Sequence, residues 1–270
     1  MTKKIWISIS IIAFLIGLML ILFGAVFCVR NQKVEFIGDR DRTLAITSEH
    51  IISTSNIEEG TATFFIDKQA IADKIERAYP YIKVINIETV SPTTLNYRLR
   101  ERVPMYYARH NDRFIVLDEE LKVLEVTSNQ PNMTLLNVSD LGVTSNTKSG
   151  EFVGVSYADL TDALFTSMYN VAKIDGEYLD RAEIRSFMTE VSFDTGYTLT
   201  KHYTRLIIKT SMGVTLDIAE PDDKLEYKLN ILMSALESDE LTLEQKSSGR
   251  LKYYLTQDNE YKAGYFETGE

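Results

Sequence analysis

Serine and lysine residues in two short segments are the side chains whose spacing could support nucleophilic catalysis. Ser145-Asn146-Thr147-Lys148 matches the S-x-x-K pattern, and Lys209-Thr210-Ser211 resembles K-T-G, the two motifs of penicillin-recognising enzymes. In those enzymes the serine opens a buried helix, whereas Ser145 lies in a polar stretch that leads into Ser149-Gly150. With 19 serines in the chain, about one S-x-x-K match arises by chance, so the pattern gives little support for catalysis.

The remaining reactive side chains show no catalytic or metal-binding spacing either. His50, His110 and His202 are far apart and form no H-x-x-x-H pair, and Cys28 adjoins a long apolar run. Gly154-Val155-Ser156-Tyr157-Ala158 falls short of the G-x-S-x-G nucleophile motif, and the sequence has no Walker or dinucleotide-binding motif. We therefore predict no catalytic residue, no cofactor, no metal ion and no small-molecule substrate.

Charge is distributed unevenly along the 270 residues. Residues 1–33 carry four bases and no acid, so the net charge of −10 leaves −14 on the other 237 residues. A chain this acidic is a poor match for nucleic acid, because phosphate contacts need clustered Lys and Arg. With 13 Gly, 5 Pro and one Cys, the composition also excludes collagen and a disulfide scaffold.

The basic start of the chain surrounds an uncharged apolar run of 24 residues, from position 5 to position 28. As a helix it would extend about 36 Å, enough to cross a hydrocarbon core of about 30 Å. A cleaved signal peptide is the alternative, but its apolar region is shorter and ends in a small-residue cleavage site. We expect a single-pass membrane helix at 5–28, a cytoplasmic tail at 1–4 and an extracytoplasmic body. Charge counting alone does not fix this orientation.

Hydrophobic periodicity predicts a compact α+β region over 34–102. Val34 to Ile37 alternates as a strand, and Thr47 or Ser48 can cap a short helix. Asp67 can cap a second helix, whose apolar face is expected at Ile71, Ile75 and Ala78 and which Pro80 ends. Strands at 82–87 and 95–99 then flank the turn at Ser91-Pro92-Thr93. The expected order is strand, helix, helix, strand, strand.

The region that follows is rich in strands and contains two long helices. A hairpin is expected around Asp118 to Leu121, in a turn that avoids a positive φ at Leu121. A helix is expected over 156–174, strands near 184–193, 203–209 and 214–218, and a helix opened by a capping box at Asp223 and Glu226. Two strands follow, near 251–255 and 261–266, with a turn at 257–259.

Four motifs in order resemble the POTRA domain of the FtsQ/DivIB family of bacterial division proteins. They are Phe64-Phe65-Ile66-Asp67 before the second helix, Tyr79-Pro80-Tyr81-Ile82 at its end, Pro92-Thr93-Thr94-Leu95 in the hairpin and Glu101-Arg102-Val103-Pro104 at the exit. The family usually has Gly where Leu121 stands. The C-terminal helix and strands, with Gly264-Tyr265 in the last strand, are similar to the family's β domain, while 127–200 diverges.

This resemblance implies a fold, a partner and a location. The fold is α+β, with a transmembrane helix at 5–28, a POTRA domain at 34–102, a mixed β domain at 103–266 and a C-terminal tail at 267–270. The function implied is a non-catalytic scaffold at the division septum that joins FtsB/DivIC-like and FtsL-like proteins and helps to control septal peptidoglycan synthesis. In the family, the last strand region takes up a segment of FtsB or DivIC by strand addition.

The last strand is also a candidate partner site on physical grounds. A strand near the terminus is a candidate sheet edge, whose unpaired N–H and C=O groups can accept a further strand. The residues concerned are Tyr261, Lys262, Ala263, Gly264, Tyr265 and Phe266. Residues 217–270 hold 13 acids and 6 bases, a balance that would suit a basic partner.

Two other functions remain open at this point. A membrane-anchored cell-wall hydrolase or transpeptidase would use Ser145 as its nucleophile. A POTRA-bearing export component would need several POTRA units and a barrel of alternating strands, and the sequence shows neither.

Overall fold

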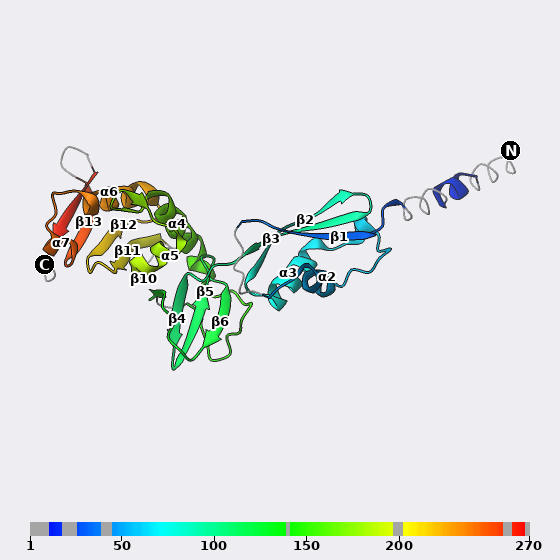
Figure 1. Cartoon of the computed structure of the whole chain (residues 1–270), viewed down its shortest axis with the longest axis horizontal. Coiled ribbons are helices and arrows are strands. Elements are labelled where there is room, and N and C mark those ends of the chain that lie inside the picture. The colour runs from blue at the N-terminus through cyan, green and yellow to red at the C-terminus, as the bar shows by residue number, and fades with distance from the viewer. Residues whose placement is uncertain are drawn as a thin grey trace. The chain divides into compact units, whose positions relative to one another are not determined.

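The chain folds into two compact units, Met1–Arg102 and Val103–Glu270 (Figure 1). The computed structural model describes residues 11–17, 26–38, 45–138, 141–196, 202–255 and 261–267. Both units contain helices and strands, and the second unit is dominated by one large sheet. The expected α+β class, with a POTRA-like order of elements followed by a strand-rich body, is confirmed at this level.

A three-stranded sheet forms the base of the first unit. Its order is β1-β3-β2, with β1 (Asn31–Phe36) parallel to β3 (Thr94–Glu101) and β2 (Ile82–Ser91) antiparallel to β3. The sheet side chains pack with the helices around a small buried cluster. Its members are Ile51, Ile75, Ile82, Ile87, Leu95, Tyr97 and Leu99.

Side-chain caps begin the two helices that pack on this sheet. Thr47 accepts the N–H of His50 and opens α2 (Ser48–Ser55). Asp67 Oδ1 accepts the N–H of Ala70 at 3.0 Å and opens α3 (Lys68–Ala78), which ends before Pro80. Between them lies the 3-10 turn η1 (Thr63–Phe65). The caps and the helix stop are as the sequence predicts.

The buried face of α3 differs from the predicted one at a single position. Ile75 is fully buried, and Ile71, Ala72 and Tyr79 pack against the cluster, whereas Ala78 is exposed. Tyr79 ends the helix and brings a much larger apolar surface than Ala78. The helix therefore turns Tyr79 inward and leaves the small side chain in solvent.

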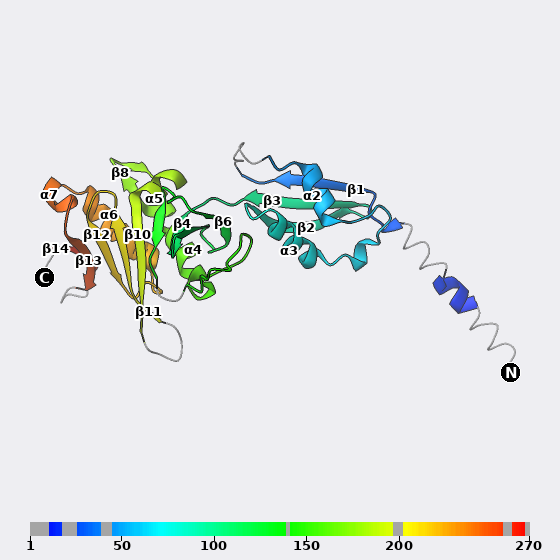
Figure 2. The same cartoon turned by 90° about the horizontal axis from the view of Figure 1, so that it is seen from below.

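Nine strands form the sheet of the second unit, in the order β14-β13-β12-β11-β10-β7-β4-β5-β6. Figure 2 shows β10 to β13 of this sheet side by side. Most neighbours are antiparallel, but β7 runs parallel to both β4 and β10, and β12 runs parallel to β13. The strands are β4 (Tyr106–His110), β5 (Arg113–Leu117), β6 (Val123–Thr127), β7 (Thr134–Leu136), β10 (Met188–Gly196), β11 (His202–Thr210), β12 (Thr215–Ala219), β13 (Arg250–Leu255) and β14 (Tyr261–Phe266).

Helices α4 (Val155–Val171) and α6 (Leu225–Glu237) pack against each other and bury their apolar faces in the main core. The helix predicted over 156–174 ends at Val171, because Lys173 and Ile174 form β8. Of its predicted apolar face, Leu160, Leu164 and Met168 are buried and Val171 is partly buried. Three shorter elements complete this unit: α5 (Arg181–Phe187), α7 (Leu243–Lys246) and the hairpin of β8 (Lys173–Ile174) and β9 (Glu177–Tyr178).

The strand expected over 184–193 begins late, because its first residues belong to α5. Asp180 accepts the N–H of Glu183 at 2.8 Å, and the Glu183 carboxylate accepts the N–H of Asp180 at 2.8 Å. This reciprocal capping box stabilises a helix across Ile184, and β10 starts only at Met188. The prediction of a strand at 184–187 was wrong.

The capping box expected at Asp223 and Glu226 does not form. Lys224, with φ 51°, precedes the first helical residue of α6, and no side chain caps this end. Since Leu225 is the first helical residue, Glu226 lies one position too early in the helix to complete a capping box with Asp223. The apolar side chains that recur along α6 at helical spacing are buried: Leu225, Leu229, Leu232, Met233 and Leu236.

Leu121 adopts a positive φ of 60°, contrary to the expectation for this hairpin. Asp118 Oδ1 accepts the N–H groups of Glu120 at 3.0 Å and Lys122 at 2.8 Å, which closes the turn around Leu121. The Leu121 side chain is fully buried beside Gly154, where an added Cβ would lie 3.1 Å from its Cδ1. Burial of this large side chain outweighs the backbone strain of about 1 kcal/mol.

The expected membrane segment, 5–28, lies mainly outside the described residues. Residues 11–17 are helical, and residues 26–28 lead into the first unit. In the described ranges no helix combines the length and the apolar character needed to span a membrane. The turn expected at 257–259 also lies outside the described residues.

Candidate partner-binding edge

Strand β14 lies at one edge of the nine-stranded sheet. It pairs antiparallel with β13 from Leu255↔Tyr261 to Arg250↔Phe266, and no other described strand pairs with its outer side. The six residues proposed from the sequence are therefore together on one strand. An edge strand turns alternate N–H and C=O groups away from its neighbour, so β14 offers a template for one more strand.

The two faces of β14 have different chemistry. Ala263 and Tyr265 pack against the main core, on the side of Leu251 and Tyr253 of β13. Because side chains alternate along a strand, Lys262, Gly264 and Phe266 belong to the opposite, open face of the sheet. There the Lys252 ammonium lies 4.5 Å from the centre of the Phe266 ring. The strand is thus anchored on one face and accessible on the other.

Gly249 makes room for the inward-facing ring of Tyr265. Gly249 has φ 76°, and a Cβ added there would lie 2.6 Å from Tyr265 Cε2 and 2.7 Å from the carbonyl oxygen of Phe266. The carbonyl oxygen of Gly249 also accepts the N–H of Thr215 at 3.0 Å, where β13 joins β12. Gly249 therefore positions the edge strand, a role that its sequence neighbourhood alone does not indicate.

A buried lysine connects α6 to the strands beneath it. Lys228 Nζ donates to the carbonyl oxygens of Glu220 at 2.8 Å and Ala219 at 3.1 Å, and lies 5.5 Å from the ring centre of Tyr253. Burial lowers the pKa of Lys228, although nearby carboxylates, Asp223 first, oppose this shift. We did not predict this role for Lys228 from the sequence, although its spacing from Leu225 and Leu232 places it on the apolar face of α6.

Basic side chains occupy the open face beside the edge. Asp217 is buried on β12, accepts from Arg205 Nε at 2.6 Å and lies 3.5 Å from Arg250. The hydrogen bond to Asp217 raises the pKa of Arg205. By strand alternation Arg250 and Lys252 share the face of Lys262. The acidic balance of 217–270 thus does not describe this face, where bases gather.

The opposite edge of the sheet, β6, is covered along its first half by residues 149–152. The N–H of Val123 donates to Glu151 at 2.8 Å, and the N–H of Gly150 donates to the carbonyl oxygen of Val123 at 2.8 Å. Ser149 Oγ donates to the carbonyl oxygen of Leu124 at 2.5 Å. These bonds use backbone groups that an added strand would need, so β14 is the more accessible edge.

The candidate catalytic segments do not assemble into a site. Ser145 lies in an irregular loop, where its Oγ is 3.5 Å from His110 Nε2 and both residues are exposed or nearly so. Lys209 Nζ lies 2.7 Å from Glu190 Oε2, and Thr210 Oγ1 donates to Val214, so this segment holds strands together. Across the described ranges no three His, Cys, Asp or Glu side chains are placed to hold a metal ion.

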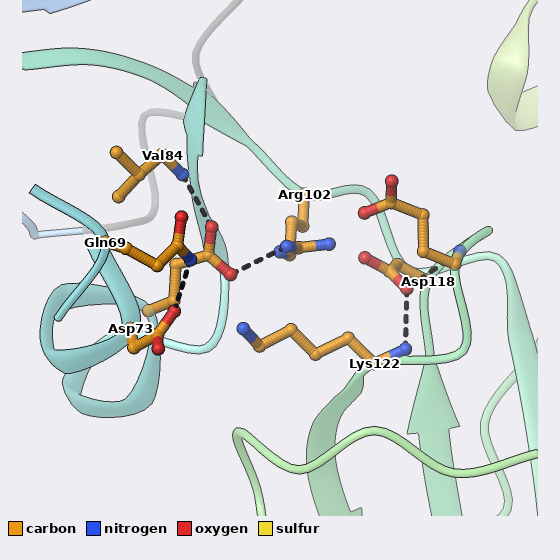
Figure 3. A network of polar contacts seen from close by, with 8 residues as sticks. Gln69, Asp73, Val84, Arg102, Asp118 and Lys122 are labelled. Carbon is orange, nitrogen blue, oxygen red and sulfur yellow. Dashed lines mark hydrogen bonds and ion pairs between the residues drawn. The ribbon is translucent and has the colours of Figure 1, made fainter. Parts of the chain in front are cut away.

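A polar network around the Glu76 carboxylate in the first unit was also not predicted from the sequence. Glu76 on α3 accepts the backbone N–H of Val84 at 2.8 Å and pairs with Arg102 at 2.9 Å (Figure 3). Val84 borders a β-bulge in β2, where the ladder to β3 is interrupted. Glu76 therefore binds an amide at the irregularity and holds the last residue of this unit against α3.

Comparison with known proteins independently supports the resemblance that the sequence motifs indicate. Residues 41–102 match the family model described as "POTRA domain, FtsQ-type". Cell division protein DivIB of Clostridium acetobutylicum is 28% identical over 99 residues, which are 37% of this chain and 39% of that protein. DivIB of Clostridium tetani is 28% identical over 41% of this chain and 40% of its own length. The matched part of the chain thus spans about two fifths of each of these relatives.

A longer and weaker similarity extends over both units. DivIB of Clostridium botulinum is 21% identical over 251 residues, which cover 93% of this chain and 89% of that protein. Residues 41–102 thus match an FtsQ-type POTRA domain, and the chain is similar to three DivIB cell division proteins, in the last case at low identity over most of its length.

Proposed function

We propose that this protein is a non-catalytic scaffold of the bacterial division machinery. Residues 5–28 anchor it in the cell membrane, residues 1–4 face the cytoplasm, and the body from 34 to 266 lies outside. Strand β14 takes up a segment of an FtsB/DivIC-like protein, which in turn brings an FtsL-like protein to the septum. Through these contacts the scaffold helps to control septal peptidoglycan synthesis.

The accessible edge at β14 is the observation that carries this proposal. It combines an outer side with no described strand on it, a core-packed face that fixes its position and an aromatic side chain on the open face. The other edge is partly closed by residues 149–152. Main-chain bonds would give affinity, and Phe266 would provide an apolar contact on one side of the added strand.

Charge on the open face defines the partner segment further. Lys262 on β14 and Lys252 on β13 lie on the same face as Phe266, so a strand added to β14 would place the side chain opposite Lys262 next to a cation. An acidic side chain at such a position gains attraction, whereas a basic one is repelled. The partner segment should therefore carry Asp or Glu on this face, a revision of the basic partner expected from composition.

The direct test is capture of the DivIC-like ectodomain by the full chain in detergent. Phe266→Lys should weaken capture because it replaces an apolar contact with a charge on the open face, while the core-facing Tyr265 stays in place. Removal of 261–270 should abolish capture. Val155→Lys is a matched control, because Val155 is 74% exposed at the start of α4, outside the edge. Wild-type capture by both edge variants would exclude β14 as the site.

Location in the cell tests the wider role. A fluorescent fusion of the full chain should gather at the division septum, and a fusion lacking residues 1–28 should lose membrane association. A fusion spread evenly around the cell, even during division, would contradict a divisome role.

An anchored cell-wall enzyme is the second candidate, favoured only by the contact between Ser145 and His110. It predicts covalent labelling of Ser145 by a β-lactam that Ser145→Ala abolishes. The scaffold proposal predicts no labelling, because the serine lies in an exposed loop rather than at the start of a buried helix.

A further inference from the structure

We propose that the end of the first unit at which the chain enters β1 is a lipid-contact surface. Phe65, Phe64 and Val90 of this surface lie in the membrane interface and hold the unit directly against the bilayer. The inference rests on the membrane anchor of the proposed function. The inference adds that the first unit itself contacts the lipid. Neither the partner-binding edge nor the similarity to DivIB proteins implies this contact.

Three side chains make this end of the unit apolar. Phe65 is 87% exposed, Phe64 is 65% exposed and Val90 is 64% exposed, the highest values among large apolar side chains in the described part of 26–102. Exposed charged residues, including Glu58, Glu59, Asp67 and Lys68, surround η1. An apolar patch with a polar rim marks a surface that meets a membrane or another protein.

Backbone hydrogen bonds connect this patch to the residues that follow the apolar run. The N–H of Thr63 donates to the carbonyl oxygen of Phe27 at 3.0 Å, and the N–H of Val29 donates to Thr61 at 2.9 Å. The rings of Phe27 and Phe64 lie with their centres 5.0 Å apart. Residues 26–29 are therefore part of the folded unit, and no loose linker separates η1 from the end of the apolar run.

The hairpin that carries Val90 meets the chain at the same end. The N–H groups of Arg30 and Asn31 both donate to the carbonyl oxygen of Thr93, at 2.8 and 3.1 Å. Val90 is the penultimate residue of β2, next to this turn. Figure 1 shows the β2–β3 turn at the end of the unit where the chain enters β1. Val90 thus lies at the same end of the unit as residues 26–29.

The length of the apolar run selects lipid as the occupant. About 20 helical residues span a hydrocarbon core, and the run from 5 to 28 has 24. Its last residues then fall at the level of the lipid headgroups, where Phe27 is bonded directly to η1. Apolar side chains at that level enter the headgroup–acyl boundary to a depth of about 5–10 Å. A soluble partner that bound Phe64 and Phe65 would therefore have to displace the bilayer that the anchor already holds beside them.

Tryptophan fluorescence of the full chain in phospholipid vesicles tests this surface. The native Trp6, inside the apolar run, reports on the anchor itself. In a Trp6→Phe background, Phe65→Trp reports on the proposed surface and Leu243→Trp is the control. Leu243 is 86% exposed, almost the same as Phe65, but lies in the second unit. Vesicles with brominated acyl chains quench only indoles that enter the bilayer.

The expected result is a blue-shifted F65W emission that brominated lipid quenches, with L243W red-shifted and unquenched. If Trp6 is quenched but F65W behaves like L243W, the anchor stands and the lipid-contact surface is excluded. If F65W is blue-shifted without quenching, the side chain is covered by protein and the inference also fails. If Trp6 is itself unquenched, the anchor of the proposed function fails, and this inference falls with it.

Discussion

Gly249 lies immediately before β13, at a position where a side chain would displace the edge strand β14. Its positive φ favours glycine, and the space that a Cβ would fill is taken by the Tyr265 ring and the Phe266 carbonyl group. A single methyl group there would push on the backbone of β14 as well as on a side chain. The position of the candidate binding edge therefore depends on the absence of an atom at residue 249.

Replacement of Gly249 by Ala should destabilise the second unit more than an equivalent change elsewhere. Gly176→Ala is the matched control, because Gly176 has φ 82° but open space around it. Both variants lose about 1 kcal/mol from the left-handed backbone. G249A should lose about 1–3 kcal/mol more from the collision, measured by urea unfolding. Equal losses would show that Gly249 does not position β14.

Glu190 provides a pH-dependent contribution to stability. Burial alone would raise its pKa, but hydrogen bonds from Lys209 and then Asn137, with the Lys209 charge, outweigh burial and lower the pKa below 4.5. Because the pKa of Glu190 is lower in the folded state, its carboxylate stabilises the fold at every pH above the pKa that the group has in the unfolded chain. This contribution is lost as pH falls through the folded pKa.

Glu190→Gln should therefore cost about 1 kcal/mol at pH 7, discounted for the exposed Lys209, and progressively less as pH falls below 4.5. Unfolding midpoints of E190Q and wild type across this range measure the effect. Adding Lys209→Met to E190Q should change little, because the pair is already broken. A constant difference at every pH would show that the charge of Glu190 is not the cause.

Capping and helix-breaking residues in the sequence predicted several helix ends, but only where a single residue determines the helix end. Asp67 and Pro80 delimit α3 as predicted, since capping and loss of an amide act within one turn. Two Asp-x-x-Glu patterns behave in opposite ways. Asp180 and Glu183, which were not predicted to cap a helix, form a capping box just before the strand predicted at 184–193, whereas Asp223 and Glu226 do not form the predicted one.

The β5–β6 turn shows why local sequence patterns do not suffice to predict backbone conformation. Propensity argued against a positive φ at Leu121, yet the turn places Leu121 in a fully buried site that only tertiary structure creates. The same limitation applies to Glu76, Lys228 and Gly249, whose partners are distant in sequence. The strand 261–266 was predictable because its pattern is local, whereas its place at the edge follows from the sheet order.

Two substitutions at Leu121 should separate strain from burial. Both Leu121→Ala and Leu121→Gly remove the buried side chain and should cost about 2–5 kcal/mol. L121G also relieves the positive φ, so it should be about 1 kcal/mol more stable than L121A. Thermal or urea unfolding of the two variants provides the comparison. If L121G were more stable than wild type, strain rather than burial would dominate at this turn.

At the scale of the whole molecule, the described residues form two units: a first unit whose residues 41–102 match the FtsQ-type POTRA family model, and a second unit built on a nine-stranded sheet. Their order, and the mixture of helices and strands in each, followed from hydrophobic periodicity. The sheet order did not, because β7 and β13 each pair in parallel with strands distant in sequence. That order decides which strands become edges, and so which surface can bind a partner.

Amide hydrogen exchange of the full chain, with and without the DivIC-like ectodomain, tests the central claim most directly. Strand addition at β14 would bond its outward N–H groups, so exchange of residues 261–266 should slow when the partner binds. Exchange along β6 should stay unchanged, because residues 149–152 already cover part of that edge. Binding of the partner with no added protection at 261–266 would contradict β14 as the partner-binding edge.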